Sequence, residues 1–232
     1  MMDALVPLLA LLPLALLGAV LGLDTVSFPQ AMLSRPLVAA TLGGTLAGSP
    51  SGGLLVGAAL ELIALETLPF GASRYPEWGS ASAVGGALFA SSPTPPAGAM
   101  SLAVIAAVAT AWIGGWSMVA MRQVIARIAH RSQSALEAGA RGSVIGLQLK
   151  GLTADLARGF VLTLVAAAIF APLTRASLAL WTLDARVSRA IAVAIAASVA
   201  GAAAWKLFHG SMPARWAFLS GLVAGFTLLA AA

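Results

Sequence analysis

The chain has 232 residues, of which 60% are hydrophobic and only 9% are charged, with a net charge of +5. A soluble domain carries about 25% charged residues, so this chain cannot cover a globule with water-facing side chains. The composition therefore excludes a soluble protein and predicts an all-α, polytopic membrane protein, since apolar stretches of about 20 residues span a bilayer as helices. The basic residues are scattered between hydrophobic stretches, which argues against a nucleic-acid partner and is typical of a multi-pass protein of the cell inner membrane.

Residue types that bind metals or cofactors are scarce. Cysteine is absent, and His130 and His209 stand alone without the spacing of metal ligands. Thiolate-based zinc, iron–sulfur and disulfide sites are therefore excluded. We expect no metal site and no cofactor.

The first apolar stretch, Ala4–Leu23, has the length of a membrane span. It is longer than the apolar core of a signal peptide and no basic segment precedes it, so we interpret it as a retained helix. A polar break, "DTVSFPQAMLSRP", follows this stretch and carries Asp24, Gln30 and Arg35.

The next stretch, Pro36–Leu60, is uncharged but repeatedly interrupted by Gly and Pro. These residues favour a turn, so we expect two half-length helices that meet at "AGSPSGG". Broken helices at membrane depth are tolerated where protein or a water-filled cavity covers their backbone, and in transporters they often form the binding site.

The remainder of the N-terminal half alternates between apolar helices and polar breaks. Gly53–Phe70 continues as a helix, "GASRYPEWG" forms the second polar break, and Ser80–Ser92 is a short, small-residue-rich segment that we expect to be re-entrant. Gly98–Met121 is an uncharged stretch long enough to span the bilayer.

A change of composition divides the chain into three regions. We expect residues 1–121 to form a membrane region with broken helices and the candidate solute site, residues 122–158 to form a basic cytoplasmic linker, and residues 159–232 to form C-terminal membrane helices. The basic residues of the linker are Arg122, Arg127, Arg131, Arg141, Lys150 and Arg158. The expected C-terminal spans are Gly159–Thr174, roughly Ala190–Trp205, and Trp216–Ala232.

Glu61 is the most informative candidate residue, because it lies inside an apolar run. A carboxylate at the bilayer centre costs about 2.5–3.5 kcal/mol on insertion scales, and such residues usually face a cavity or a partner. One interpretation is a structural ion pair or hydrogen bond to another helix; the one that we prefer is a polar ligand for a hydrophilic solute. Glu66 is five residues further on, about 140° around a regular helix, so the two do not form a paired acid–base site.

The polar breaks supply weaker candidates. Arg74 and Glu77 in the second break are either a loop ion pair or part of the solute path, and Asp24 is either a helix cap or a ligand beside Gln30 and Arg35. We find no nucleophile set and no phosphate-binding loop, so no catalytic residue is expected. From the residues alone we expect a polytopic transporter with a polar site at the membrane midplane.

Four motifs in the order in which they occur resemble the IIC component of the mannose/sorbose-type sugar phosphotransferase system. They are "LD" at Leu23–Asp24, "RPLVAATLGG" at Arg35–Gly44, "GLLVGAALELIAL" at Gly53–Leu65 and "GASRYPE" at Gly71–Glu77. Glu61 matches the family's intramembrane Glu, and Glu77 matches a family Asp/Glu position. The chain departs from many members at Gly48-Ser49, where they have Gly-Asp.

The resemblance implies a sugar permease that is not catalytic on its own, with its sugar site in residues 1–121. A IID membrane subunit would accompany it, a trimer of the IIC–IID complex being the family's expected assembly, and soluble IIA and IIB proteins would phosphorylate the incoming sugar. The sugar-binding residues expected here are Glu61, Asp24, Gln30, Arg35, Arg74 and Glu77. The alternative is an ion- or proton-coupled secondary transporter of a small polar solute, with Glu61 as a proton carrier; an intramembrane enzyme is a third class, for which no reactive set is found.

Overall fold

The computed structural model describes residues 9–67, 75–91, 95–208 and 211–231, and every regular element within them is a helix. The helices are α2 (Leu12–Val26), α3 (Pro36–Leu46), α4 (Pro50–Ala64), the short 3-10 helix η1 (Leu65–Thr67), α5 (Trp78–Ala90), α6 (Ala99–Arg131), α7 (Gln133–Glu137), α8 (Arg141–Ala179), α9 (Ala185–Phe208) and α10 (Met212–Ala231). The predicted all-α fold is confirmed.

The break predicted at "AGSPSGG", between two half-length helices, is also confirmed. Helix α3 ends at Leu46 and α4 begins at Pro50, and both helices start with Pro at a position where a missing N–H is harmless. Gly48 makes the turn with a φ of +88°, and the Ser49 side chain caps α4 by accepting a hydrogen bond from the Gly52 N–H at 3.3 Å. The residue at the departure from the family motif therefore acts as a helix N-cap, a role that Asp fills equally well.

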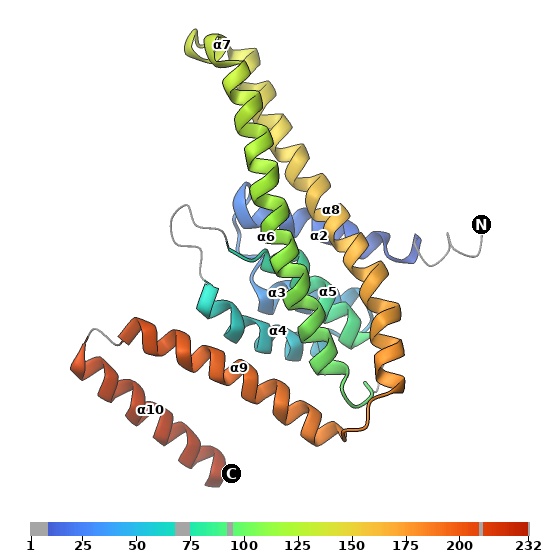
Figure 1. Ribbon diagram of the computed structural model, residues 1–232, viewed down its shortest axis with the longest axis vertical. Helices are drawn as coiled ribbons and strands as arrows, with labels where there is room; N and C mark the ends of the chain where they lie inside the picture. Colours follow the sequence, from blue (N-terminus) through green and yellow to red (C-terminus); the bar gives the residue numbers. More distant parts are fainter. Residues whose placement is uncertain (1–8, 68–74, 92–94, 209–210, 232) are drawn as a thin grey trace.

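A long antiparallel hairpin dominates the shape of the molecule. Helices α6 and α8 run side by side, with α7 at their tip, and the tip projects beyond the other helices (Figure 1). The two helices contain 33 and 39 residues, so at 1.5 Å per residue they are about 50 and 58 Å long, against about 30 Å for the hydrocarbon core of a bilayer. The expected linker, residues 122–158, consists of α7 and the ends of these two helices.

The short helices pack together beside the other end of the hairpin. Helix α3 contacts α4 and α5, and α2 packs against α8 where the two helices cross (Figure 1). Buried residues between these helices are mainly Ala and Gly, which lets their backbones approach closely. The re-entrant placement of α3, α4 and α5 in a bilayer stays a prediction.

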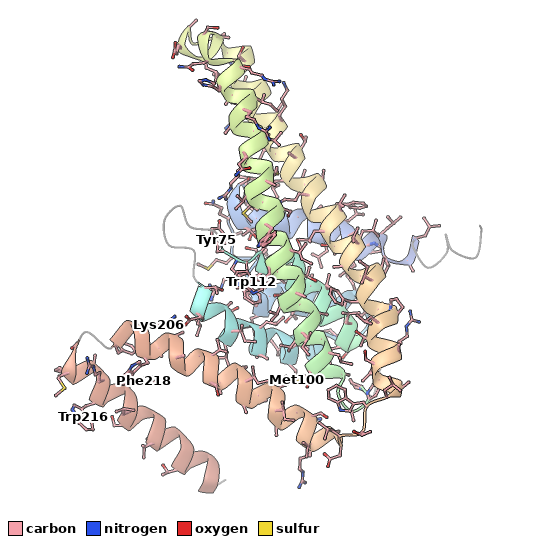
Figure 2. All side chains as sticks on the ribbon, viewed as in Figure 1. Tyr75, Met100, Trp112, Lys206, Trp216 and Phe218 are labelled. Atoms are coloured by element: carbon pink, nitrogen blue, oxygen red, sulfur yellow. The ribbon has the colours of Figure 1, made fainter. Side chains whose placement is uncertain are left out.

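The last two helices form an arm on the outside of this bundle. Helix α9 packs across α4 and α6, whereas α10 contacts α9 through the Phe208–Phe218 ring pair, whose centroids are 5.9 Å apart (Figure 2). Four elements in the described part of the chain are long and apolar enough to cross a membrane: Pro50–Thr67, α6, α8 and Ala185–Lys206. Two shorter apolar helices, Leu12–Thr25 and α3, accompany them.

Candidate functional site

Asp24 organises the segment that joins α2 to α3. Its buried carboxylate lies at the C-terminal end of α2, where Oδ1 accepts a hydrogen bond from the Ala31 N–H at 2.6 Å and Oδ2 accepts one from the Ser34 N–H at 2.9 Å. Both oxygens of one carboxylate thus bind backbone donors of the same segment. Residues 27–35, which we call the α2–α3 loop, are folded around this side chain, and Asp24 does not cap a helix start.

Arg35, the last residue of the α2–α3 loop, forms an ion pair with Glu61 of α4. The second carboxylate oxygen of Glu61 accepts a hydrogen bond from the Leu37 N–H at 3.1 Å, so Glu61 also satisfies a free donor at the N-terminus of α3. The positive end of the α3 dipole favours a negative charge at this place. The side chains of Arg35 and Glu61 are 39% and 22% exposed, so the ion pair is not sealed off from its surroundings.

The ion pair with Arg35 explains how the chain tolerates Glu61 inside an apolar run. Arg35 balances its charge although the two residues lie 26 positions apart in the chain. Gln30 lies in the same loop with an exposed side chain and a φ of +56°. The structure therefore places Arg35 and Glu61 in contact at the N-terminal end of α3, and Asp24 is hydrogen-bonded to the loop that carries Gln30 and Arg35.

Glu77 lies in a different environment from this group. It is completely buried and caps α5, because its Oε1 accepts from the Ser80 N–H at 3.1 Å and from the Thr25 hydroxyl at 3.4 Å. Its own N–H donates to the Ala111 carbonyl of α6 at 2.8 Å, and Oε2 has no partner among the described residues. These contacts favour a structural role for Glu77. Arg74 lies outside the described residues.

A second, deeply buried ion pair lies outside the site residues that the sequence predicts. Asp155 and Arg158 of α8 are 6% and 7% exposed, with 3.6 Å between Asp155 Oδ1 and Arg158 Nε. In the sequence they stand at the end of a run of scattered charges and are indistinguishable from its solvent-exposed members. The only sequence signal is their place directly before the apolar stretch that begins at Gly159.

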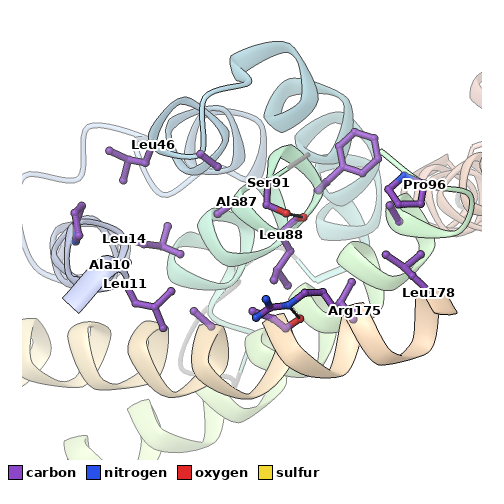
Figure 3. Close-up of a pocket in the computed structure, with 17 residues that line it drawn as sticks. Ala10, Leu11, Leu14, Leu46, Ala87, Leu88, Ser91, Pro96, Arg175 and Leu178 are labelled. Carbon is purple, nitrogen blue, oxygen red and sulfur yellow. Dashed lines mark hydrogen bonds between the residues drawn. The ribbon is translucent and has the colours of Figure 1, made fainter. Parts of the chain in front are cut away.

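One cavity among the described residues is separate from these charged groups. It has a volume of about 540 Å³ and is bounded by α2, α3, α5, α6 and α8 (Figure 3). Its walls are largely apolar, and the Arg175 side chain at its edge donates back to the Ala171 carbonyl of the same helix at 3.3 Å. An apolar wall cannot satisfy the hydroxyls of a sugar, so this cavity is not our sugar-site candidate.

A shallow groove of about 530 Å³ lies on the hairpin. It is lined by Leu136 of α7, by a face of α8 that includes Val144 and Leu152, and by Ser27, the first residue of the α2–α3 loop. Within the described part of the chain, no group of three or more His, Asp or Glu side chains is placed to hold a metal ion.

The comparisons with known proteins agree with this architecture. The family model described as "PTS system sorbose-specific IIC component" matches residues 8–180, which include the broken helices, the polar cluster and the hairpin. The chain belongs to this family. The predicted recognition is thereby confirmed: the protein is a membrane component of a sugar-transport phosphotransferase system, and α9 and α10 lie beyond the matched range.

A solved structure entitled "Structure of membrane protein" supports the fold. It is 19% identical, with a TM-score of 0.74, and the likeness covers 94% of this chain and 87% of the other. At this identity the likeness establishes the all-α membrane fold and nothing about the substrate. No curated protein sequence matches this chain.

Proposed function

We propose that this IIC component binds a sugar at the exposed side of the Arg35–Glu61 pair and carries it across the membrane. The observation that carries the proposal is the partly exposed ion pair at the end of two broken helices. A sugar hydroxyl is both donor and acceptor. Glu61 offers it carboxylate oxygens, Arg35 offers it N–H groups, and such charge-assisted hydrogen bonds are stronger than neutral ones.

Each of the remaining candidates has a defined part in this proposal. Gln30 is the third sugar ligand, since its amide extends from the same loop. Asp24 acts indirectly, by holding the backbone of the loop through Ala31 and Ser34. Glu77 stabilises the junction of α2, α5 and α6, and Arg74 remains a candidate ligand on sequence grounds alone.

The hairpin is the proposed docking place for the soluble phosphoryl donor, a IIB protein charged through IIA. Its tip region carries exposed basic side chains, among them Arg127, Arg131 and Arg141, which complement an acidic or phosphorylated partner. The groove between the tip and Ser27 gives such a partner an apolar surface next to the α2–α3 loop. In this arrangement the tip is cytoplasmic and the chain itself transfers no phosphate.

The proposed membrane partners are a IID subunit and further copies of the IIC–IID unit in a trimer. Large apolar side chains on α9 and α10, including Val193, Trp216 and Val223, are exposed. A partner subunit or lipid covers such a surface in a bilayer. Figure 2 shows Trp216 on α10, at the outer side of the arm.

Reconstitution tests the transport step. Vesicles that contain the chain with IID are loaded with IIA and IIB that already carry their phosphoryl groups, and radiolabelled sorbose is added on the outside. We expect sorbose phosphate inside these vesicles and none in vesicles that contain the chain alone. Sugar phosphate formed by the chain without its partners contradicts the proposal, as does a complete system that moves no sugar from a panel of hexoses and ketohexoses.

Thiol labelling tests the orientation of the hairpin. The chain has no cysteine, so Ser134→Cys introduces a unique thiol on α7. In intact cells this thiol resists a membrane-impermeant maleimide, and it reacts once the membrane is opened. Ready labelling from outside places the tip on the wrong side for a cytoplasmic phosphoryl donor.

A further inference from the structure

Asp155 and Arg158 lie where α8 crosses α2, and their polar contacts are directed at the end of α2. The Ser27 hydroxyl donates to Asp155 Oδ2 at 2.5 Å, and Arg158 donates through Nη2 to the Gly22 carbonyl at 3.4 Å. Two charges that are both more than nine-tenths buried are expensive unless they are paired and hydrogen-bonded. The hydrogen bonds with the Ser27 hydroxyl and the Gly22 carbonyl therefore offset part of the cost of burying this pair.

Packing between α2 and α8 does not depend on the contact with Ser27. A Cβ atom on Gly159 would lie 2.5 Å from the Gly18 carbonyl oxygen, and one on Gly22 would lie 3.1 Å from the Gly159 Cα. The two backbones are thus already in close contact along the helix crossing. Ser27 lies beyond the last residue of α2, at the point where the α2–α3 loop begins.

The α2–α3 loop is consequently held by two carboxylates from two sides. Asp24 binds its middle through Ala31 and Ser34, and Asp155 binds its first residue, Ser27, which is 128 positions away in the chain. Arg35, at the far end of the loop, is the partner of Glu61. A shift of the loop at Ser27 changes where its other residues stand relative to Glu61.

We propose that Asp155 and Arg158 are positioning residues for sugar binding, which act through Ser27 and Gly22 on the α2–α3 loop. This inference rests on the proposed function, in which Gln30, Arg35 and Glu61 contact the sugar. Ser27 also lines the groove on the hairpin, so it adjoins both the surface proposed for the soluble partner and the loop proposed for the sugar.

The decisive variant is Ser27→Ala, because it removes one hydroxyl and leaves the Asp155–Arg158 pair intact. Ser27→Thr keeps the hydroxyl and serves as the rescue. Ser198→Ala is the matched control, since the Ser198 hydroxyl donates to the Ala194 carbonyl of its own helix and is far from the loop in the chain. Equal elution profiles in gel filtration establish that all three variants are folded.

The first readout needs neither sugar nor partner. Hydrogen exchange followed by mass spectrometry reports the amides of Ala31 and Ser34, which are bonded to Asp24. In Ser27→Ala we expect their exchange to quicken about tenfold, because local opening of the loop becomes easier. Ser27→Thr and Ser198→Ala exchange like the original chain. Unchanged exchange in Ser27→Ala overturns the inference, whatever the protein transports.

The second readout is sorbose uptake in vesicles with the complete set of partners. Losing a hydrogen bond to a charged group weakens the organised state of the loop, so KM rises about tenfold while the maximal rate stays within about twofold. A purely structural role instead lowers the yield of folded protein and leaves KM unchanged. If loop exchange is faster in Ser27→Ala but the original chain takes up no sorbose, the proposed function is contradicted. The anchoring of the loop by Ser27 is still supported in that case.

Asp155→Asn provides a second, independent variant. The amide still accepts a hydrogen bond from Ser27, but it no longer balances the buried charge of Arg158. Because Arg158 is then buried without a balancing charge, we expect loop exchange in the folded fraction of this variant to rise at least as much as in Ser27→Ala. Loop exchange like that of the original chain contradicts the assignment of Asp155 as an anchor of the loop.

Discussion

The short helices α3–α5 and the terminal helices α9–α10 use small residues in opposite ways. Between α3 and α5 the backbones touch: a Cβ on Gly43 would lie 2.1 Å from the Ala83 carbonyl oxygen, and one on Gly86 would lie 2.1 Å from that of Ala40. At Gly201 of α9 and Gly221 of α10, nothing among the described residues lies within 4 Å of the same position. Glycine is thus a packing requirement in the first region and leaves open surface in the second.

The difference shows where the fold supports the candidate site. Close backbone packing in the first region holds α3 against α4 and α5, the Arg35–Glu61 pair joins α3 to α4, and this region lies inside the family match. The terminal arm lies outside that match and exposes large apolar side chains to its surroundings. Substitutions at corresponding positions of the two regions test this contrast.

The largest loss of folded protein is expected for Gly86→Ala. The new methyl group meets the backbone of Ala40, which cannot move aside like a flexible side chain, so α3 and α5 must separate. Overpacking costs roughly 1–3 kcal/mol or more. The yield of monodisperse protein in detergent and its thermal midpoint measure the loss.

Gly201→Ala is the control for this change. Its methyl group enters open space, and replacing Gly by Ala inside a helix is favourable by about 0.5–1 kcal/mol. Folded yield should therefore be equal to or above that of the original chain. Equal losses in both variants would remove the contrast between the two regions.

An intermediate effect is expected for Glu61→Gln. The amide keeps an acceptor for the Leu37 N–H but loses the charge, and charge-assisted hydrogen bonds contribute about 1.5–3 kcal/mol, so sugar affinity falls roughly tenfold to a hundredfold. Arg35 is half-buried and retains access to solvent, so folded yield survives. Sugar binding and folded yield are measured on the same preparation.

Glu66→Gln is the matched control, because Glu66 also pairs with a cation, Lys206 of the terminal arm. Its sugar affinity should equal that of the original chain. A proton-coupled transporter behaves differently: Glu61→Gln then keeps solute binding and loses the pH dependence of transport. Unchanged affinity together with a low yield of folded Glu61→Gln protein makes Glu61 structural.

The smallest effect is expected for Lys206→Gln. The lysine side chain is 68% exposed, and exposed ion pairs contribute about 0–1 kcal/mol. The thermal midpoint in detergent should stay close to that of Arg186→Gln, which removes an exposed charge at the other end of α9. A large loss of stability in Lys206→Gln alone would show that the arm is fixed to η1 through this pair.

Local features of the sequence determined a large part of this protein. Low charge and long apolar stretches set the membrane class, since a bilayer admits little else. Gly48 and Pro50 set the break between α3 and α4, because their backbone preferences act within a few residues. The ordered motifs around Glu61 set the family, and the family model confirms it.

Tertiary structure alone decided which charges meet. Arg35 and Glu61 are 26 positions apart and Ser27 and Asp155 are 128 apart, so neither contact leaves a periodic signal in the sequence. Asp155 and Arg158 resemble the exposed charges of the hairpin until α8 is packed on α2, and Glu77 becomes a buried cap only where α2, α5 and α6 converge. Burial and pairing depend on the packing of distant helices, whereas hydropathy and turn preference are properties of neighbouring residues.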